Sequence, residues 1–158
     1  MRKAQSKPRD IKEDPIYKNK LVTKLINRSM RDGEKSVAAR QIYAAFDIIA
    51  KETGEDALKT FIQAIENIKP SMEVRARRIG GAAYQVPSPV RGTRKESLAI
   101  RWLVTVANLR PNSQFRTYGA KLAAEIMDAA KGEGAAVGKR KEIERSAEAN
   151  KAFAHFKW

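Results

Sequence analysis

Few side chains of this sequence are suited to catalysis. The only histidine is His155, near the end of the chain, and there is no cysteine. These counts exclude thiolate chemistry, a Ser-His-Asp triad and a histidine-rich zinc site. Gly132 and Gly134 form a G-x-G pattern, but it lacks the strand-to-helix context and the Lys-Ser/Thr of a phosphate-binding loop. We therefore expect a protein that is not an enzyme and needs no metal or cofactor.

Positive charge dominates the composition. The 158 residues include 32 Lys and Arg against 18 Asp and Glu, which gives a net charge of +14. A charge of this sign attracts polyanions, because each neutralised phosphate releases condensed counterions. Membranes are anionic too, but the sequence has no apolar run of membrane length, no signal-peptide pattern and no cysteine for lipidation. The sequence favours a soluble, cytoplasmic nucleic-acid-binding protein without a membrane partner.

Apolar periodicity predicts a mainly α fold. Six segments repeat apolar residues every three to four positions, the spacing of one helix face. The expected helices span 15–31, 34–51, 56–69, 93–109, 114–130 and about 139–156. Between the third and fourth helices the period changes to two, which predicts a β-hairpin over 72–87. We expect a six-helix bundle with one projecting hairpin, formed by a single domain at 15–158 behind a mobile basic arm at 1–14.

The predicted hairpin is rich in arginine. Its strands meet at Gly80-Gly81, where positive φ is tolerated, and Pro87 and Pro89 are expected to end it. A two-stranded ribbon is only marginally stable by itself. Because its arginines are expected on an exposed side, the sequence suggests an arm that a partner completes.

Two further local patterns set helix boundaries. Thr93 and Glu96 have the T-x-x-E spacing of a capping box, which predicts the start of the fourth helix. The glycine-rich segment 131–138 is expected to act as a hinge before the last helix.

Two of the predicted helices have a polar face with basic residues and no carboxylate, as a phosphate-facing surface requires. On the first helix this face consists of Lys20, Lys24, Asn27, Arg28 and Arg31. On the fourth it consists of Arg94, Ser97, Arg101, Thr105 and Asn108. One such stripe alone is usually a solvated surface. Two stripes, a basic arm and an arginine-rich hairpin together favour nucleic-acid binding.

Three aromatic residues allow both a structural and a binding role. Tyr84 could stack on an unpaired base, although packing against Met72 or Val74 across the ribbon is favoured. Trp102 lies at helical spacing from apolar residues and is expected in the core. Trp158 is expected to dock onto the body.

Four segments closely resemble one protein family. They are RDGEKSVAARQIYAAFDII (31–49), KPSMEVRARRIGGAAYQVPSPV (69–90), RKESLAIRWLV (94–104) and AEANKAFAHFKW (147–158). They resemble bacterial small-subunit ribosomal protein seven, the S-seven family, and the likeness extends over nearly the whole chain. One departure is Glu34, where the family's motif usually reads Gly-Lys-Lys, so no phosphate contact is carried over to that position.

The resemblance implies a structural constituent of the ribosome with six helices and an extended hairpin. It implies a primary binder of small-subunit rRNA that nucleates assembly of the subunit head. It also implies a hairpin close to exit-site tRNA, and small-subunit proteins nine and eleven as neighbours. Some relatives repress their own messenger RNA, and the sequence leaves that open here.

Charge pattern and resemblance together define the expected RNA contacts. The expected rRNA-binding residues, all basic, are Arg2, Lys3, Lys7, Arg9, Lys20, Lys24, Arg28, Arg31, Lys35, Arg75, Arg77, Arg78, Arg91, Arg94, Lys95 and Arg101. The expected tRNA-proximal residues, at the hairpin tip, are Arg78, Ile79, Gly80, Gly81, Ala82, Ala83 and Tyr84. Lys35, Arg91 and Lys95 rest on the resemblance alone.

Two other functions are alternatives to this interpretation. A DNA-binding architectural protein can also use a basic ribbon, but the tip at 80–82 has no apolar wedge for a base step. A metal-dependent nuclease would need carboxylates in defined roles, and no spacing assembles them. One core accounts for the apolar stripes, so we expect a monomer in isolation.

Overall fold

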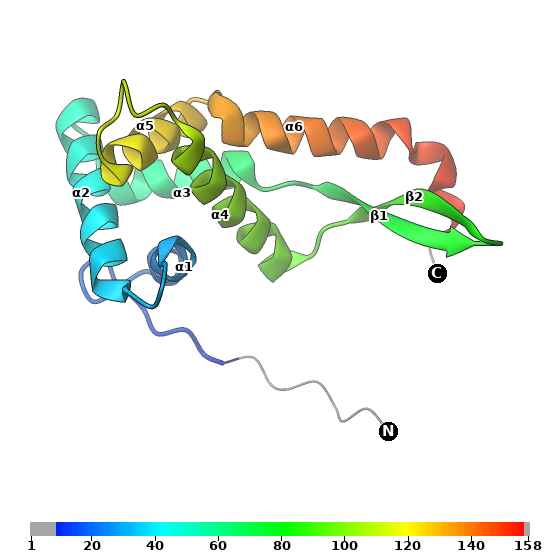
Figure 1. Cartoon of the computed structure of the whole chain (residues 1–158), viewed down its shortest axis with the longest axis horizontal. Coiled ribbons are helices and arrows are strands. Elements are labelled where there is room, and N and C mark those ends of the chain that lie inside the picture. The colour runs from blue at the N-terminus through cyan, green and yellow to red at the C-terminus, as the bar shows by residue number, and fades with distance from the viewer. Residues whose placement is uncertain (1–8, 157–158) are drawn as a thin grey trace.

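The structure, a computed structural model, describes residues 9–156. Five helices form a body, and a sixth helix and a hairpin extend from it in the same direction (Figure 1). The α-helices are α1 (Lys20–Ser29), α2 (Lys35–Thr53), α3 (Ala57–Ile68), α4 (Gly92–Leu109), α5 (Tyr118–Ala130) and α6 (Gly134–Ala149). The hairpin strands are β1 (Met72–Ile79) and β2 (Ala82–Pro89), and a 3-10 helix, η1 (Lys151–Phe156), follows α6. The predicted mainly α fold with a hairpin between the third and fourth helices is confirmed.

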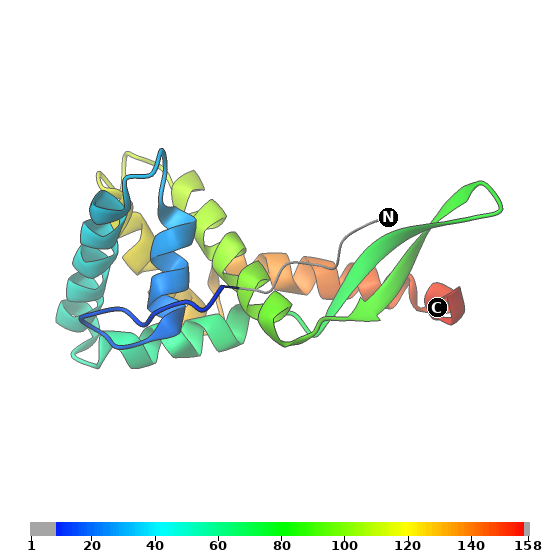
Figure 2. The same cartoon turned by 90° about the horizontal axis from the view of Figure 1, so that it is seen from below.

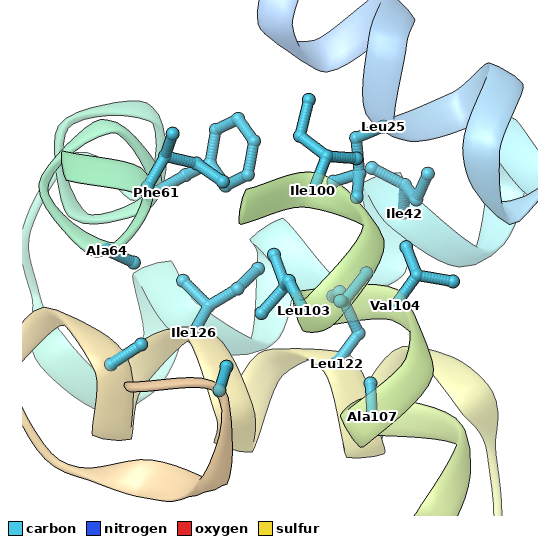
Figure 3. Packing of buried hydrophobic residues seen from close by; sticks show 14 of the residues in the cluster. Leu25, Ile42, Phe61, Ala64, Ile100, Leu103, Val104, Ala107, Leu122 and Ile126 are labelled. Carbon is cyan, nitrogen blue, oxygen red and sulfur yellow. The ribbon is translucent and has the colours of Figure 1, made fainter. Parts of the chain in front are cut away.

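The core lies in the helical body around α5, which contacts α2, α3, α4 and α6. Phe61 of α3, Leu103 of α4 and Ile126 of α5 are fully buried and point toward one another (Figure 3). Burying one side chain of this size stabilises the fold by about 1.5–3 kcal/mol. The body therefore provides most of the apolar burial, and the elements that extend from it depend on it.

The first helix begins later than the sequence predicts. Asp14 accepts two backbone N–H groups, with N to Oδ2 distances of 3.0 and 3.1 Å, and so holds a turn over 15–17. Lys18 then adopts a positive φ of 47°, and Asn19 caps the helix that starts at Lys20. The predicted start at residue 15 is wrong because aspartate hydrogen bonds compete with a helical backbone.

The same aspartate ties this segment to α2. The hydroxyl of Tyr43 donates to Asp14 Oδ1 at 2.7 Å, and the rings of Tyr17 and Tyr43 lie 6.0 Å apart. Burial and this hydrogen bond to the carboxylate raise the pKa of Tyr43 to about 12. Residues 14–17 are thus anchored to the body.

The hairpin has the predicted turn but extends further than predicted. Gly80 and Gly81 have φ values of 56° and 90°, and β2 runs antiparallel to β1 with Ile79 opposite Ala82. Pro87 lies inside β2 and Pro89 is its last residue, so the hairpin ends at the second proline and the predicted end at residue 87 is wrong. Only one side of β2 pairs with a strand, so alternate N–H groups point outward, and a proline at those positions loses no ladder hydrogen bond.

The starts of α4 and α5 also differ from the sequence predictions. The capping box of Thr93 and Glu96 does not form, since α4 starts at Gly92 without a side-chain cap. Glu96 contacts Lys24 of α1 instead. The fifth helix begins at Tyr118, four residues later than predicted, because the residues before it form turns and bends.

The segment 131–138 is fixed by a buried carboxylate, so the expected hinge is wrong. Glu125 is fully buried, and its Oε1 accepts the backbone N–H of Ala136 at 2.9 Å, in the first turn of α6. Its Oε2 accepts from Arg110 Nε at 2.9 Å and Nη2 at 2.6 Å. The last helix therefore starts at Gly134, and it ends at Ala149, ahead of η1, instead of continuing to 156.

Residues from the C-terminal part of the chain brace the hairpin. Glu144 of α6 accepts hydrogen bonds from the backbone N and the Oγ of Ser71, at 2.9 and 2.7 Å. Further out, the ring of Tyr84 lies 5.4 Å from that of Phe153 and 5.3 Å from that of Phe156, both in η1. The C-terminal segment lies beside the hairpin in both views (Figures 1 and 2). Part of the ribbon's stability thus comes from within the chain.

Candidate nucleic-acid interface

Most of the predicted α1 stripe lines one groove, whereas only Ser97 of the predicted α4 stripe does. Helices α1 and α4 pack side by side, and an open groove of about 550 Å³ lies between them. Its polar lining consists of Lys20, Lys24, Asn27 and Arg28 from α1, Thr93 and Ser97 from α4, and Arg9 and Asp10 from the segment before α1. Packing thus places cations of α1 and of the segment before it around one concave surface, to which α4 contributes neutral polar groups.

Two carboxylates lie at this groove and were not anticipated: Asp10 lines it, and Glu96 pairs with one of its lysines. Glu96 of α4 forms an ion pair with Lys24 of α1, and their side chains are 29% and 28% exposed. Projecting each helix separately shows no acid on either stripe, because Glu96 approaches Lys24 only once the helices pack. Lys24 is therefore partly neutralised, whereas Lys20 and Arg28 are exposed at the same groove.

Polar contacts link the C-terminal ends of α1 and α4 to each other and to α5. Arg31 Nη2 donates to Asn108 Oδ1 at 3.3 Å, and the hydroxyls of Ser29 and Tyr118 are 2.8 Å apart. Burial raises the pKa of Tyr118, and its hydrogen bond with Ser29 opposes that shift. These contacts hold Arg31 and Asn108, one from each predicted stripe, side by side.

At the base of the hairpin a carboxylate joins two of the predicted arginines. Glu73 of β1 is 6% exposed, and both Arg75 and Arg94 form ion pairs with it. Arg75 comes from the same strand and Arg94 from the first turn of α4. Burial alone would raise the pKa of Glu73, but hydrogen bonds from Arg94 and Arg75 outweigh it and lower that pKa below its ordinary value.

The other predicted rRNA contacts make no ion pair within residues 9–156, and all are exposed except Lys95, which is half-buried. They are Arg9, Lys20, Arg28, Arg31, Lys35, Arg77, Arg78, Arg91, Lys95 and Arg101. Arg2, Lys3 and Lys7 lie outside the described residues. Most of the predicted cations are therefore accessible to a phosphate group.

At the hairpin tip the backbone is exposed and Tyr84 is half covered. Arg78 and residues 80–83 are exposed, and Ile79 is half-buried. Tyr84 packs on the phenylalanines of η1, so the prediction that it packs against Met72 or Val74 is wrong. Trp102, by contrast, packs against the core as predicted, and Trp158 is outside the described residues.

Sequence reasoning missed the acids and aromatics that arrange these cations. Glu73 alternates with Arg75 and Arg77 in β1, and that alternation is a signal that a buried carboxylate could pair with the arginines. The signal for the η1 aromatics was weaker, because Phe153 and Phe156 meet Tyr84 only in the folded chain.

Within residues 9–156, no group of three or more His, Asp or Glu residues is placed to hold a metal ion. No helix in that same range has the length and apolar character to cross a membrane.

A helical body with a cationic groove and an arginine-rich ribbon is the arrangement of a nucleic-acid-binding protein. The sequence model of the family "Ribosomal protein S7p/S5e" matches residues 1–151. Small ribosomal subunit protein uS7 of Carboxydothermus hydrogenoformans is 56% identical over 150 residues, covering 95% of this chain and 94% of that protein. The uS7 proteins of Thermus thermophilus and Streptococcus pneumoniae are 51% and 53% identical over 157 residues, covering 99% of both chains in each case.

The chain therefore belongs to the ribosomal protein S7p/S5e family. It is a structural constituent of the small ribosomal subunit, a cytoplasmic particle in which it accompanies rRNA, and it is not an enzyme. The resemblance noted from the sequence is confirmed at the level of the family.

Proposed function

We propose that this chain is a primary binder of small-subunit rRNA and that it nucleates assembly of the subunit head. In this proposal residues 15–158 act as one RNA-binding domain, and the basic segment 1–14 acts as an additional arm. The predicted rRNA contacts in the groove, at the base of the hairpin and along α4 hold RNA helices that would otherwise repel one another.

One observation carries the proposal. The groove lining and the hairpin base meet at the start of α4, where Thr93 lines the groove and the next residue, Arg94, forms an ion pair with Glu73 of β1. A surface that runs from one helix pair onto a ribbon can contact phosphates of more than one RNA helix. Affinity for RNA then comes mainly from phosphate neutralisation, which is strongly dependent on salt.

The hairpin supports the finer part of the proposal. It projects away from the body (Figure 2), and Arg78 and residues 80–83 at the tip are exposed. A basic tip at the end of an extended ribbon suits a contact with a second RNA, and we assign it to exit-site tRNA. Small-subunit proteins nine and eleven complete the proposed set of neighbours.

The proposal predicts a steep dependence of rRNA binding on salt. The affinity for a junction fragment of the small-subunit rRNA head is measured by filter binding between about 50 and 200 mM salt. The log–log slope should be about −0.9 for each neutralised phosphate of a duplex. Replacing Lys20 and Arg28 with Ala should weaken binding and reduce the slope by about 0.9 for each phosphate that the variant no longer neutralises.

A matched variant controls for total charge. Lys51→Ala with Lys59→Ala removes the same two charges from exposed positions of α2 and α3, outside the groove. This variant should bind rRNA nearly as well as the unchanged protein. Equal losses in both variants, a flat salt slope, or tighter binding to duplex DNA of the same length would each contradict the proposal.

A further inference from the structure

A buried acid lies within the proposed rRNA surface, where a carboxylate is unexpected. The Glu73 side chain is 8% exposed, whereas those of its partners Arg75 and Arg94 are 57% and 51% exposed. An acid at an RNA surface repels phosphate, and burying it costs several kcal/mol unless it is well paired. The Glu73 carboxylate is thus buried, and the two guanidinium-bearing side chains are exposed to solvent.

The hydrogen bonds show which parts of the arginines are fixed. Arg94 Nε donates to both Glu73 oxygens at 2.9 and 2.7 Å, and its Nη2 lies 2.7 Å from Oε2. Arg75 Nε donates to Oε1 at 2.7 Å, and its Nη2 lies 2.5 Å from the same oxygen. Each guanidinium thus uses its Nε edge on one carboxylate.

The Nη1 edges of the two guanidinium groups remain available to a ligand. A guanidinium has five N–H donors, and Nε with one Nη2 hydrogen accounts for two of them. In the part of the chain that the structure describes, the Nη1 atoms of Arg75 and Arg94 have no hydrogen-bond partner. The triad has a net charge of +1, which matches the single negative charge of a phosphodiester group.

The Glu73 carboxylate also lowers the energetic cost of placing two arginines side by side. Two guanidinium groups repel each other, and a free arginine side chain loses conformational entropy when it is ordered on binding. Glu73 offsets the repulsion and orders both side chains before RNA arrives. Arg77 and Arg78, further along β1, are exposed and have no such partner among residues 9–156.

We propose that Glu73 is a positioning residue that holds Arg75 and Arg94 as a two-guanidinium clamp for one phosphate group of rRNA. This inference rests on the proposed function and adds a defined phosphate site to it. The clamp joins the hairpin to the first turn of α4, so it also fixes the angle at which the ribbon leaves the body.

The test compares two substitutions that remove the same charge. Glu73→Gln and Glu96→Gln each delete one carboxylate from the proposed rRNA surface. Glu96→Gln frees Lys24 and should increase the affinity for the rRNA junction fragment. Glu73→Gln should weaken binding about five- to hundred-fold, because two long side chains must then be ordered on binding. Simple charge repulsion predicts the opposite sign for Glu73.

A double-mutant cycle separates positioning from damage to the hairpin. In a protein that already carries Arg75→Ala and Arg94→Ala, Glu73→Gln should cause no further loss of affinity, because the side chains on which it acts are gone. A further loss equal to that in the unchanged protein would mean that Glu73 acts through the fold, and would overturn the inference. Hydrogen exchange of β1 and β2 amides in each variant reports the state of the hairpin.

The log–log slope of rRNA affinity against salt concentration measures how many phosphates the two arginines neutralise. Replacing both arginines should reduce the log–log slope by about 0.9, the value for one phosphate, and a reduction of about 1.8 would overturn the single-phosphate clamp. Binding by Glu73→Gln that is as tight as that of the unchanged protein would also overturn it. Either result leaves the proposed function standing if the unchanged protein binds rRNA with a steep slope. Failure of the unchanged protein to bind the rRNA fragment would instead contradict the proposed function.

Discussion

The helical body and the extended arm of this protein are stabilised in different ways. The body buries large side chains such as Phe46, Phe61 and Leu103 completely. The arm, formed by the hairpin with α6 and η1, buries far fewer apolar groups and relies on polar and aromatic contacts between its parts (Figure 1). Because local opening follows local burial, the body should set the global stability and the arm should open first.

The largest expected effect comes from breaking the body. Phe61→Ala leaves a cavity among fully buried residues of α3, α4 and α5, and it should lower the free energy of unfolding by about 3–5 kcal/mol. Leu109→Ala, at a side chain that is 78% exposed, should change it by less than about 0.5 kcal/mol. Urea denaturation followed by circular dichroism measures both. Similar midpoints for the two variants would show that the core does not limit stability.

The sequence predicted the body better than the arm for the same physical reason. Apolar spacing identifies helices whose faces are buried together, and residues such as Ile42 and Leu122, which follow this spacing, are fully buried. Single polar groups decide the boundaries, and they act through contacts that periodicity does not contain. Asp14 and Glu125 show this: each hydrogen-bonds the backbone and so shifts the start of a helix away from its predicted position.

The candidate interface was likewise predicted only in part from the sequence. The sequence identified which helix faces and which strand carry cations, since charge is a property of residues. It did not identify the carboxylates that pair with them, because Glu96 reaches Lys24 from another helix and Glu73 reaches Arg94 across 21 positions. The groove itself exists only once α1 and α4 pack together.

The junction between body and arm should give an intermediate effect. Gly134, the first residue of α6, has φ +86°, and a Cβ there would lie 3.0 Å from Glu125 Oε1 and 3.1 Å from the Cβ of Asp128. Gly134→Ala should therefore cost about 1–2 kcal/mol from the left-handed backbone, with additional crowding at Glu125. Thermal unfolding measures the loss.

Gly138 is a control for Gly134 because it lies in the same helix and nothing is within 4 Å of an added Cβ. Gly138→Ala should stabilise the protein by about 0.5–1 kcal/mol, since alanine is the better helix former. The two alanine substitutions are thus expected to have opposite signs. Equal and small effects would mean that the start of α6 is not fixed by the Glu125 contact and that the segment is a hinge after all.

The smallest effect on global stability should come from weakening the aromatic contact between η1 and the hairpin. Phe156→Ala removes the ring that lies 5.3 Å from that of Tyr84, and an aromatic pair of this kind contributes about 0.5–1.5 kcal/mol beyond burial. The amides of β2 near Tyr84 should exchange with solvent about two- to twelve-fold faster, because the brace opens more often. The melting temperature should hardly change, since it reports the body.

Lys151→Ala, at an exposed position of the same 3-10 helix, should leave the exchange of β2 unchanged. Mass spectrometry of deuterium uptake separates β2 peptides from those of α5. If Phe156→Ala lowered the melting temperature as much as a core substitution does, the arm and the body would unfold as one unit. Faster exchange in β2 alone would show instead that the hairpin opens while the helical body stays folded.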